Sequence, residues 1–159
     1  MAKSAVKNPR FYAGTPLEKR RVLAVDSVTW KSQQPGTFDS NGLASVCATD
    51  AVDVKFIFLE DQDTATSTSY VWVGIIPDGA QFIGYLSSDD ADTAATRAMI
   101  GDQYGIHVGS NVATVNSNET SNVCVVVKDI AWVAEAFKNA EADDPGQVIF
   151  EYLTSVREV

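Results

Sequence analysis

The chain has 159 residues, 45% of them hydrophobic, with a formal net charge of −9 at pH 7 and an isoelectric point near 4.4. This length fits one domain with its own core. Because affinity for nucleic acid rests on clustered Lys and Arg, the acidic balance argues against a nucleic-acid-binding protein. The start of the chain lacks a signal-peptide pattern, and no apolar run approaches the length of a membrane span, so we expect a soluble protein made in the cytoplasm.

Positive charge is concentrated at the start of the chain. The first 31 residues hold seven Lys or Arg against two acidic residues, a net +5, whereas residues 32–159 carry a net −14. Phe11 and Tyr12 lie there among basic, small and turn-forming residues without helical or strand periodicity. We predict an extended basic arm over residues 1–21 and an acidic β-rich body over residues 22–159. The two aromatic side chains then need another surface for burial, on the body or on a neighbour.

The body opens with extended patterns. Residues 22–30 (VLAVDSVTW) predict a strand, and residues 52–60 (VDVKFIFLE) come close to the period-two alternation of a half-buried strand. Further strands are predicted at residues 104–109, 111–115, 121–130 and 147–156.

The clearest local signal is SYVWVGIIPDGAQFIGYL. Residues 70–76 and 81–86 are apolar runs on either side of a Pro-Asp-Gly turn, which predicts a β-hairpin. Gly74 and Gly84 inside these runs indicate a bulge or a close approach of another backbone.

Two segments have helical patterns. Residues 87–101 (SSDDADTAATRAMIG) begin with N-capping Ser and Asp, continue through Ala-rich helix formers and end at a glycine. Residues 131–146 (AWVAEAFKNAEADDPG) follow a helical apolar repeat that DDPG closes. The predicted fold class is therefore mainly β: a single barrel or sandwich of about eight strands with two short helices, preceded by the N-terminal arm.

The residues that carry chemistry are sparse. His107, the one histidine, lies in a predicted strand without a nucleophile-elbow serine, so we interpret it as structural. Cys47 and Cys124 lie in apolar runs without metal-binding spacing, and we predict buried free thiols. We therefore expect no enzyme, no cofactor and no metal site, although sequence alone leaves a paired-carboxylate glycosidase open.

Acidic clusters and tryptophans have ordinary interpretations as well. The carboxylates near positions 60, 90 and 143 match no calcium-binding loop, and we interpret them as solvated charge, with Asp89 and Asp90 at a helix start. Trp72 lies in mid-strand and is predicted to pack in the core, whereas Trp30 fits either the core or a contact surface.

One resemblance concerns the C-terminal half, from residue 82 to residue 148. The order of its segments resembles that of capsid decoration, or cement, proteins of tailed bacteriophages. The segments are DDADTAATRAMIG, GDQYGIHV, VNSNETSN, NVCVVVKDI and GQVIFEYL. The resemblance implies a structural virion protein on the outer surface of the head that cements neighbouring major capsid proteins against DNA pressure. It also implies that the arm reaches onto the shell, and that the protein self-associates, with a trimer as the expected form.

The expected capsid-binding residues are the basic and aromatic side chains of the arm: Lys3, Lys7, Arg10, Phe11, Tyr12, Lys19, Arg20 and Arg21. Their partner would be the major capsid protein of the same phage, with neither membrane nor direct nucleic-acid contact. Two alternatives stay open: a structural protein of a phage tail or neck, and a β-barrel that binds a small ligand or a carbohydrate.

Overall fold

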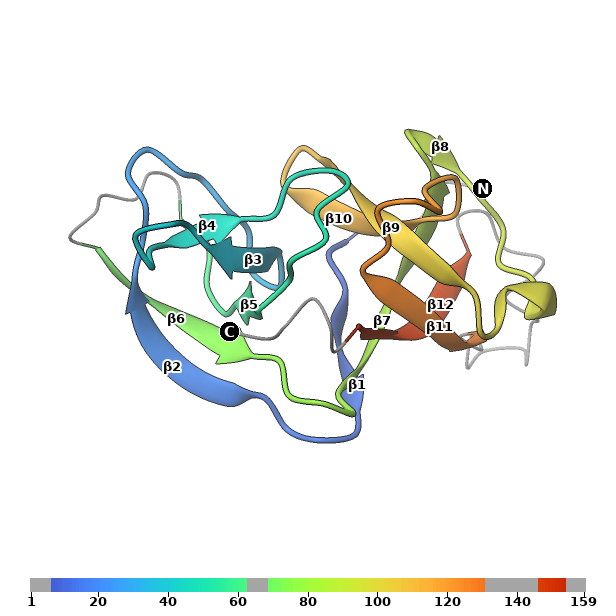
Figure 1. Ribbon diagram of the computed structural model, residues 1–159, viewed down its shortest axis with the longest axis horizontal. Coiled ribbons are helices and arrows are strands. Elements are labelled where there is room, and N and C mark those ends of the chain that lie inside the picture. The colour runs from blue at the N-terminus through green and yellow to red at the C-terminus, as the bar shows by residue number, and fades with distance from the viewer. Residues whose placement is uncertain (1–6, 63–68, 131–145, 154–159) are drawn as a thin grey trace.

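The computed structural model describes residues 7–62, 69–130 and 146–153, and it is mainly β (Figure 1). The elements in chain order are β1 (Arg10–Ala13), β2 (Glu18–Leu23), β3 (Pro35–Phe38), β4 (Ala44–Val46), β5 (Phe56–Phe58), β6 (Tyr70–Ile75), β7 (Gln81–Ser88), β8 (Ala91–Asp92), the 3-10 turn η1 (Arg97–Met99), β9 (Gln103–Gly109), β10 (Val112–Asn116), β11 (Val125–Ile130) and β12 (Gln147–Tyr152). No described helix has the length and hydropathy needed to span a bilayer.

Five strands close into a barrel in the order β7, β10, β9, β11 and β12, with β12 pairing back onto β7. All pairs are antiparallel except β7 with β10. β1 and β8 add to β7 outside this ring. Inside, Phe82 lies 6.0 Å from the ring of Phe150 and 5.1 Å from that of Tyr152, so aromatic side chains fill the barrel.

The second sheet, on the left in Figure 1, has the order β2, β6, β5, β3 and β4. A parallel bridge between Ala24 and Ala44 joins its two edge strands just beyond β2. Its core surrounds Trp30, which is fully buried, stacks on Phe58 at 4.3 Å and donates from Nε1 to the carbonyl of Glu60. Trp30 is therefore a core residue.

The N-terminal segment is part of this fold. β1 pairs antiparallel with β7 and β2 pairs antiparallel with β6, so residues 10–23 run alongside residues 70–83. The side chain of Asn8 also holds this segment in place: its Nδ2 donates to the carbonyls of Asn111 and Ser32, and its Oδ1 accepts from the amide of Ala113. The expectation of an extended arm is thus wrong for residues 7–21, and its boundary at Arg21 falls within β2. Residues 1–6 lie outside the described residues.

Glycines mark where this segment packs. A Cβ at Gly74 would meet Leu17, and one at Gly84 would meet Pro9, which is buried. Gly14 has a φ of +90°, and a Cβ there would run into the carbonyl oxygen of Gly79 in the neighbouring turn. The atoms that lie close to Gly74 and Gly84 belong to side chains, those of Leu17 and Pro9 among them, and not to another backbone. The close backbone approach predicted at these glycines is therefore not what the structure shows.

The two strands of the predicted hairpin exist, but they do not pair with each other. β6 pairs with β2 and β5, whereas β7 belongs to the barrel. The turn after β6 therefore connects two sheets, and the hairpin prediction is wrong because local patterning specifies strands and a turn without specifying partners.

The first predicted helix is also wrong. β7 runs through Ser88, β8 follows, and helical geometry is confined to η1. Asp89 has a φ of +53°, its amide donates to Oδ1 of Asn116, and its carboxylate accepts from the side chains of Asn116 and Asn118. These bonds to residues more than 25 positions away hold a turn where local propensity favours a helix. The second predicted helix, residues 131–146, falls almost wholly outside the described residues.

Candidate functional site

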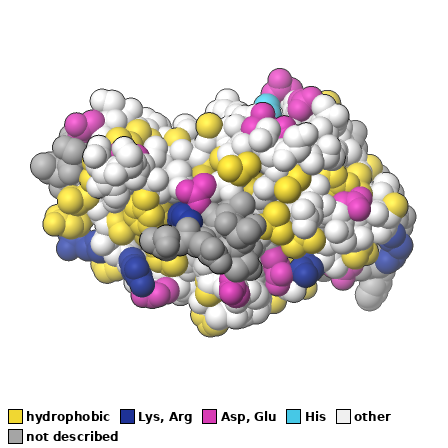
Figure 2. Space-filling model, viewed as in Figure 1, with side chains coloured by type: hydrophobic (Ala, Val, Ile, Leu, Met, Phe, Trp, Pro, Cys, Tyr) yellow, Lys and Arg dark blue, Asp and Glu magenta, His cyan; other side chains and the backbone are white. Residues whose placement is uncertain are grey.

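A cationic and aromatic surface covers the outer side of β2 and β6. In the antiparallel register Arg21 faces Trp72 and Leu23 faces Tyr70. The Nζ of Lys19 lies 4.7 Å from the centroid of the Trp72 ring, and the Cζ of Arg21 lies 4.8 Å from that of Tyr70. We call these four residues, Lys19, Arg21, Tyr70 and Trp72, the cation–aromatic face. Figure 2 shows Lys and Arg side chains at the lower left of the molecule, where Figure 1 draws β2 and β6.

The aromatic half of this face was missed by sequence reasoning. Trp72 is 39% exposed and Tyr70 is 58% exposed, so the prediction that Trp72 packs in the core is wrong. The signal was present in the alternation of YVWVG, because Val71 and Val73 are buried and their neighbours must point to the opposite side of the sheet.

The other expected capsid-binding residues are dispersed. Arg20 points away from the face and its Nε donates to Glu18 at 2.8 Å. Arg10 and Tyr12 are exposed on β1, beside the barrel. Phe11 packs edge-on against Phe82, with ring centroids 6.2 Å apart, and remains 37% exposed. Lys7 is exposed before β1, and Lys3 lies outside the described residues. Of the eight expected residues, Lys19 and Arg21 lie together on the cation–aromatic face, whereas the aromatic contact of Phe11 is with the barrel.

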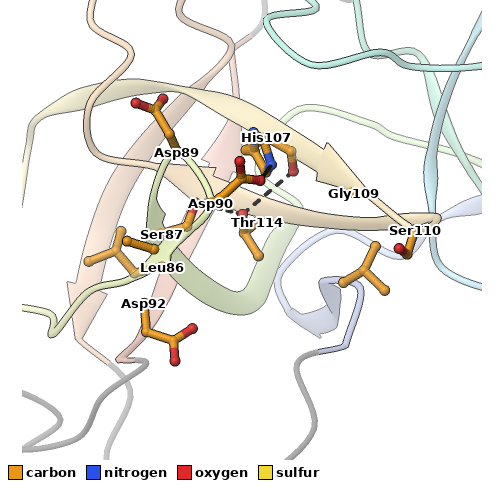
Figure 3. A pocket seen from close by; sticks show the side chains of 11 residues that line it. Leu86, Ser87, Asp89, Asp90, Asp92, His107, Gly109, Ser110 and Thr114 are labelled. Carbon is orange, nitrogen blue, oxygen red and sulfur yellow. Dashed lines mark hydrogen bonds and ion pairs between the residues drawn. The ribbon is translucent and has the colours of Figure 1, made fainter.

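A second candidate is a pocket of about 330 Å³ beside the turn between β7 and β8 (Figure 3). Asp90 reaches from this turn to His107 on β9, with 2.8 Å between Oδ1 and Nε2. Ser87 and Thr114 share a hydrogen bond of 2.7 Å between their hydroxyl oxygens. In the described part of the chain, His107 thus pairs with a carboxylate and the two hydroxyl groups pair with each other.

The carboxylates around this pocket already have roles in the turn. Donation from the side chains of Asn116 and Asn118 lowers the pKa of Asp89 below its ordinary value. Asp90 is almost fully exposed. Asp89 and Asp90 therefore form a turn rather than the expected helix start. Among the described residues, no group of three metal-ligating side chains converges.

The two cysteines are free and buried, as predicted. Burial raises the pKa of Cys124 to about 12 and raises that of Cys47 further. A thiol with so high a pKa stays protonated near neutral pH and is a poor nucleophile. Both side chains belong to a hydrophobic cluster formed by residues of the barrel together with residues of the second sheet.

The two candidates differ in what they offer a partner. The pocket presents polar groups that are mostly satisfied by one another. The cation–aromatic face presents exposed Trp, Tyr, Lys and Arg side chains on a protein of net charge −9. Trp, Tyr and Arg are the side chains that most often dominate binding energy at protein interfaces. The face is therefore the stronger candidate for a binding site.

Comparisons with protein-family models, curated proteins and solved structures gave no match to this chain.

Proposed function

We propose that this chain is a structural virion protein that attaches to the outer surface of a tailed-phage head and cements neighbouring major capsid proteins. The resemblance of residues 82–148 to decoration proteins motivates the class of function. The cation–aromatic face is the observation that carries the attachment. Its basic side chains fit a carboxylate-bearing protein surface, and its aromatic rings supply apolar contact area at the same place.

The route of attachment differs from the one expected from sequence. Residues 10–13 and 18–23 pair within their own chain, so they are not free to reach across a shell. In the proposal the folded body docks with the outer side of β2 and β6. Most of the acidic surface then stays in solvent, where charge of one sign opposes aggregation of particles. Self-association as a trimer and synthesis in the host cytoplasm remain part of the proposal.

The test is co-sedimentation of the full chain with heads assembled from the major capsid protein of the same genome. We expect the wild-type protein to sediment with the heads. The double variant Lys19→Glu/Arg21→Glu should bind at least about tenfold more weakly, because repulsion replaces attraction and both cation–π pairs are lost.

The matched control is Arg10→Glu/Lys31→Glu. It makes the same change in net charge at two exposed positions outside the face. Retained binding by the control, with loss by the first variant, supports the face. Failure of the wild-type protein to bind heads, or equal weakening of both variants, contradicts the proposal. Immunogold labelling of tails instead of heads would favour the tail alternative.

The pocket supports the ligand-binding alternative. Its volume is at the lower end of the range for small-molecule sites, and Asp90 and His107 could both bond a polar ligand such as a sugar hydroxyl. Titration of labelled protein with a panel of monosaccharides, followed by NMR, would test this. Saturable shifts confined to β7, β8, β9 and β10 would support the alternative over the structural role.

A further inference from the structure

The edge of β2 carries unused main-chain groups. The amide of Ala24 donates to the carbonyl of Ser69 on the β6 side, whereas the amide of Val25 donates to Ala44 on the opposite side. Because main-chain groups alternate direction along a strand and the β2–β6 register is continuous, the N–H and C=O groups of Lys19 and Arg21 point away from β6. Across the described ranges, these groups of Lys19 and Arg21 have no hydrogen-bond partner.

An open edge can accept a further strand, and charge selects among strands. A strand added there would place its side chains about 5 Å from those of Lys19 and Arg21, on the same side of the sheet. Acidic side chains at alternate positions would pair with both cations. A second copy of β2 is disfavoured because its own Lys19 and Arg21 would lie against these cations.

Single-stranded nucleic acid also binds basic and aromatic surfaces, but two observations disfavour it here. Bases need open ring faces for stacking, whereas Lys19 and Arg21 already lie over the rings of Trp72 and Tyr70. Affinity for a phosphate backbone also depends on many clustered Lys and Arg side chains, whereas the cation–aromatic face offers two cations, Lys19 and Arg21. Protection of an edge against aggregation explains its charges, but it does not explain the two exposed aromatic rings beside them.

We infer that the edge of β2 binds an extended acidic segment of a partner protein as an additional antiparallel or parallel strand. Main-chain hydrogen bonds to Lys19 and Arg21 provide affinity, and their side chains select acidic residues at alternate positions. This inference rests on the proposed function only in identifying the partner as a capsid subunit. The mode of binding follows from the edge itself.

The test is residue-resolved amide hydrogen exchange on 15N-labelled full-length protein. The probe is the capped peptide Thr-Glu-Val-Glu-Val-Glu-Thr, with the same peptide carrying Lys for Glu as the control and a thymidine oligonucleotide as a third probe. We expect the acidic peptide alone to slow exchange at Lys19 and Arg21 by about tenfold or more. The amides of Arg20 and Val22 already face β6, so their exchange should change much less.

A pair of variants isolates the main-chain contribution. Arg21→Ala and Arg21→Pro both remove the side chain, but only the proline removes the outward N–H. Since this N–H is not used within the chain, both variants should keep the native circular dichroism spectrum. The proline variant should bind the acidic peptide about threefold to tenfold more weakly than the alanine variant.

Three results would overturn the inference: no binding of the acidic peptide up to about 1 mM, binding without protection at Lys19 and Arg21, or equal protection by the lysine peptide or the oligonucleotide. Attachment to heads without protection of these amides would reject strand addition while leaving the proposed function in place. Protection of these amides by the peptide, without attachment of the protein to heads, would support strand addition and reject the proposed function.

Discussion

Replacement of Gly14 by alanine tests whether residues 7–21 belong to the fold. Gly14 has a φ of +90°, which costs an L-residue about 1–2 kcal/mol. The new Cβ would also strike the carbonyl oxygen of Gly79, and relief of such overpacking costs about 1–3 kcal/mol more. We therefore expect Gly14→Ala to lower the free energy of unfolding by about 3 kcal/mol, or the melting temperature by roughly 6–12 °C.

The matched control is Gly101→Ala. Gly101 has a φ of +93°, and an added Cβ there would meet open space. This variant should show the backbone cost alone, about 1–2 kcal/mol. Both free energies can be measured by urea denaturation followed by tryptophan fluorescence, with the slope against denaturant as a check on two-state behaviour.

If the N-terminal segment were a free arm instead, the expected change in the free energy of unfolding would be different. In a free arm, Gly→Ala would restrict only a segment that is flexible in both states, and stability would change little or rise slightly. A Gly14→Ala variant that is as stable as the wild type, or less destabilised than Gly101→Ala, would refute the docking of the N-terminal segment on the β6–β7 connection.

Three further predictions concern side chains. Trp30→Ala should lower the free energy of unfolding by about 3–5 kcal/mol, measured by thermal or urea unfolding, because its ring is fully buried. Trp72→Ala should lower it by about 1 kcal/mol or less and should weaken attachment to heads. Cys47 and Cys124 should react with a thiol reagent at pH 8 only at the rate of unfolding; rapid reaction of the native protein would contradict their burial. Because the folded-state pKa of Asp89 is lowered, its stabilising contribution is fully present above the ordinary aspartate value of about 3.8 and is lost as pH falls towards the lowered value. The stability gap between wild type and Asp89→Asn should accordingly be constant near neutral pH and shrink in acid, and a gap that widens in acid would show that the sign is wrong.

The failures of sequence-based prediction share a physical cause. Residues 87–101 have good local helix signals, yet the asparagines that hold Asp89 in a turn come 27 and 29 residues later. Helix propensities differ by a few tenths of a kcal/mol per residue, so a few well-placed hydrogen bonds to distant residues outweigh them. No reading of the local segment contains that information.

The same reasoning applies to the N-terminal segment. Its residues show no periodicity of their own, and the evidence that it docks lies in other parts of the chain, at Gly74 and Gly84. The sequence predicts a bulge or a close backbone approach at those glycines, whereas side chains, including Leu17 and Pro9, lie against them. What approaches them depends on which strands become neighbours in the folded protein.

By itself the sequence determined the mainly β class, most strand positions from β6 onwards, and the burial of both cysteines, because these depend on local alternation and apolar runs. Only the tertiary structure decided that β6 and β7 belong to different sheets, that residues 10–23 complete those sheets, and that Trp72 lies beneath Lys19 on an exposed face. These features depend on pairing between distant segments. Because every residue supplies nearly the same main-chain groups, the local sequence of a strand does not specify its partner.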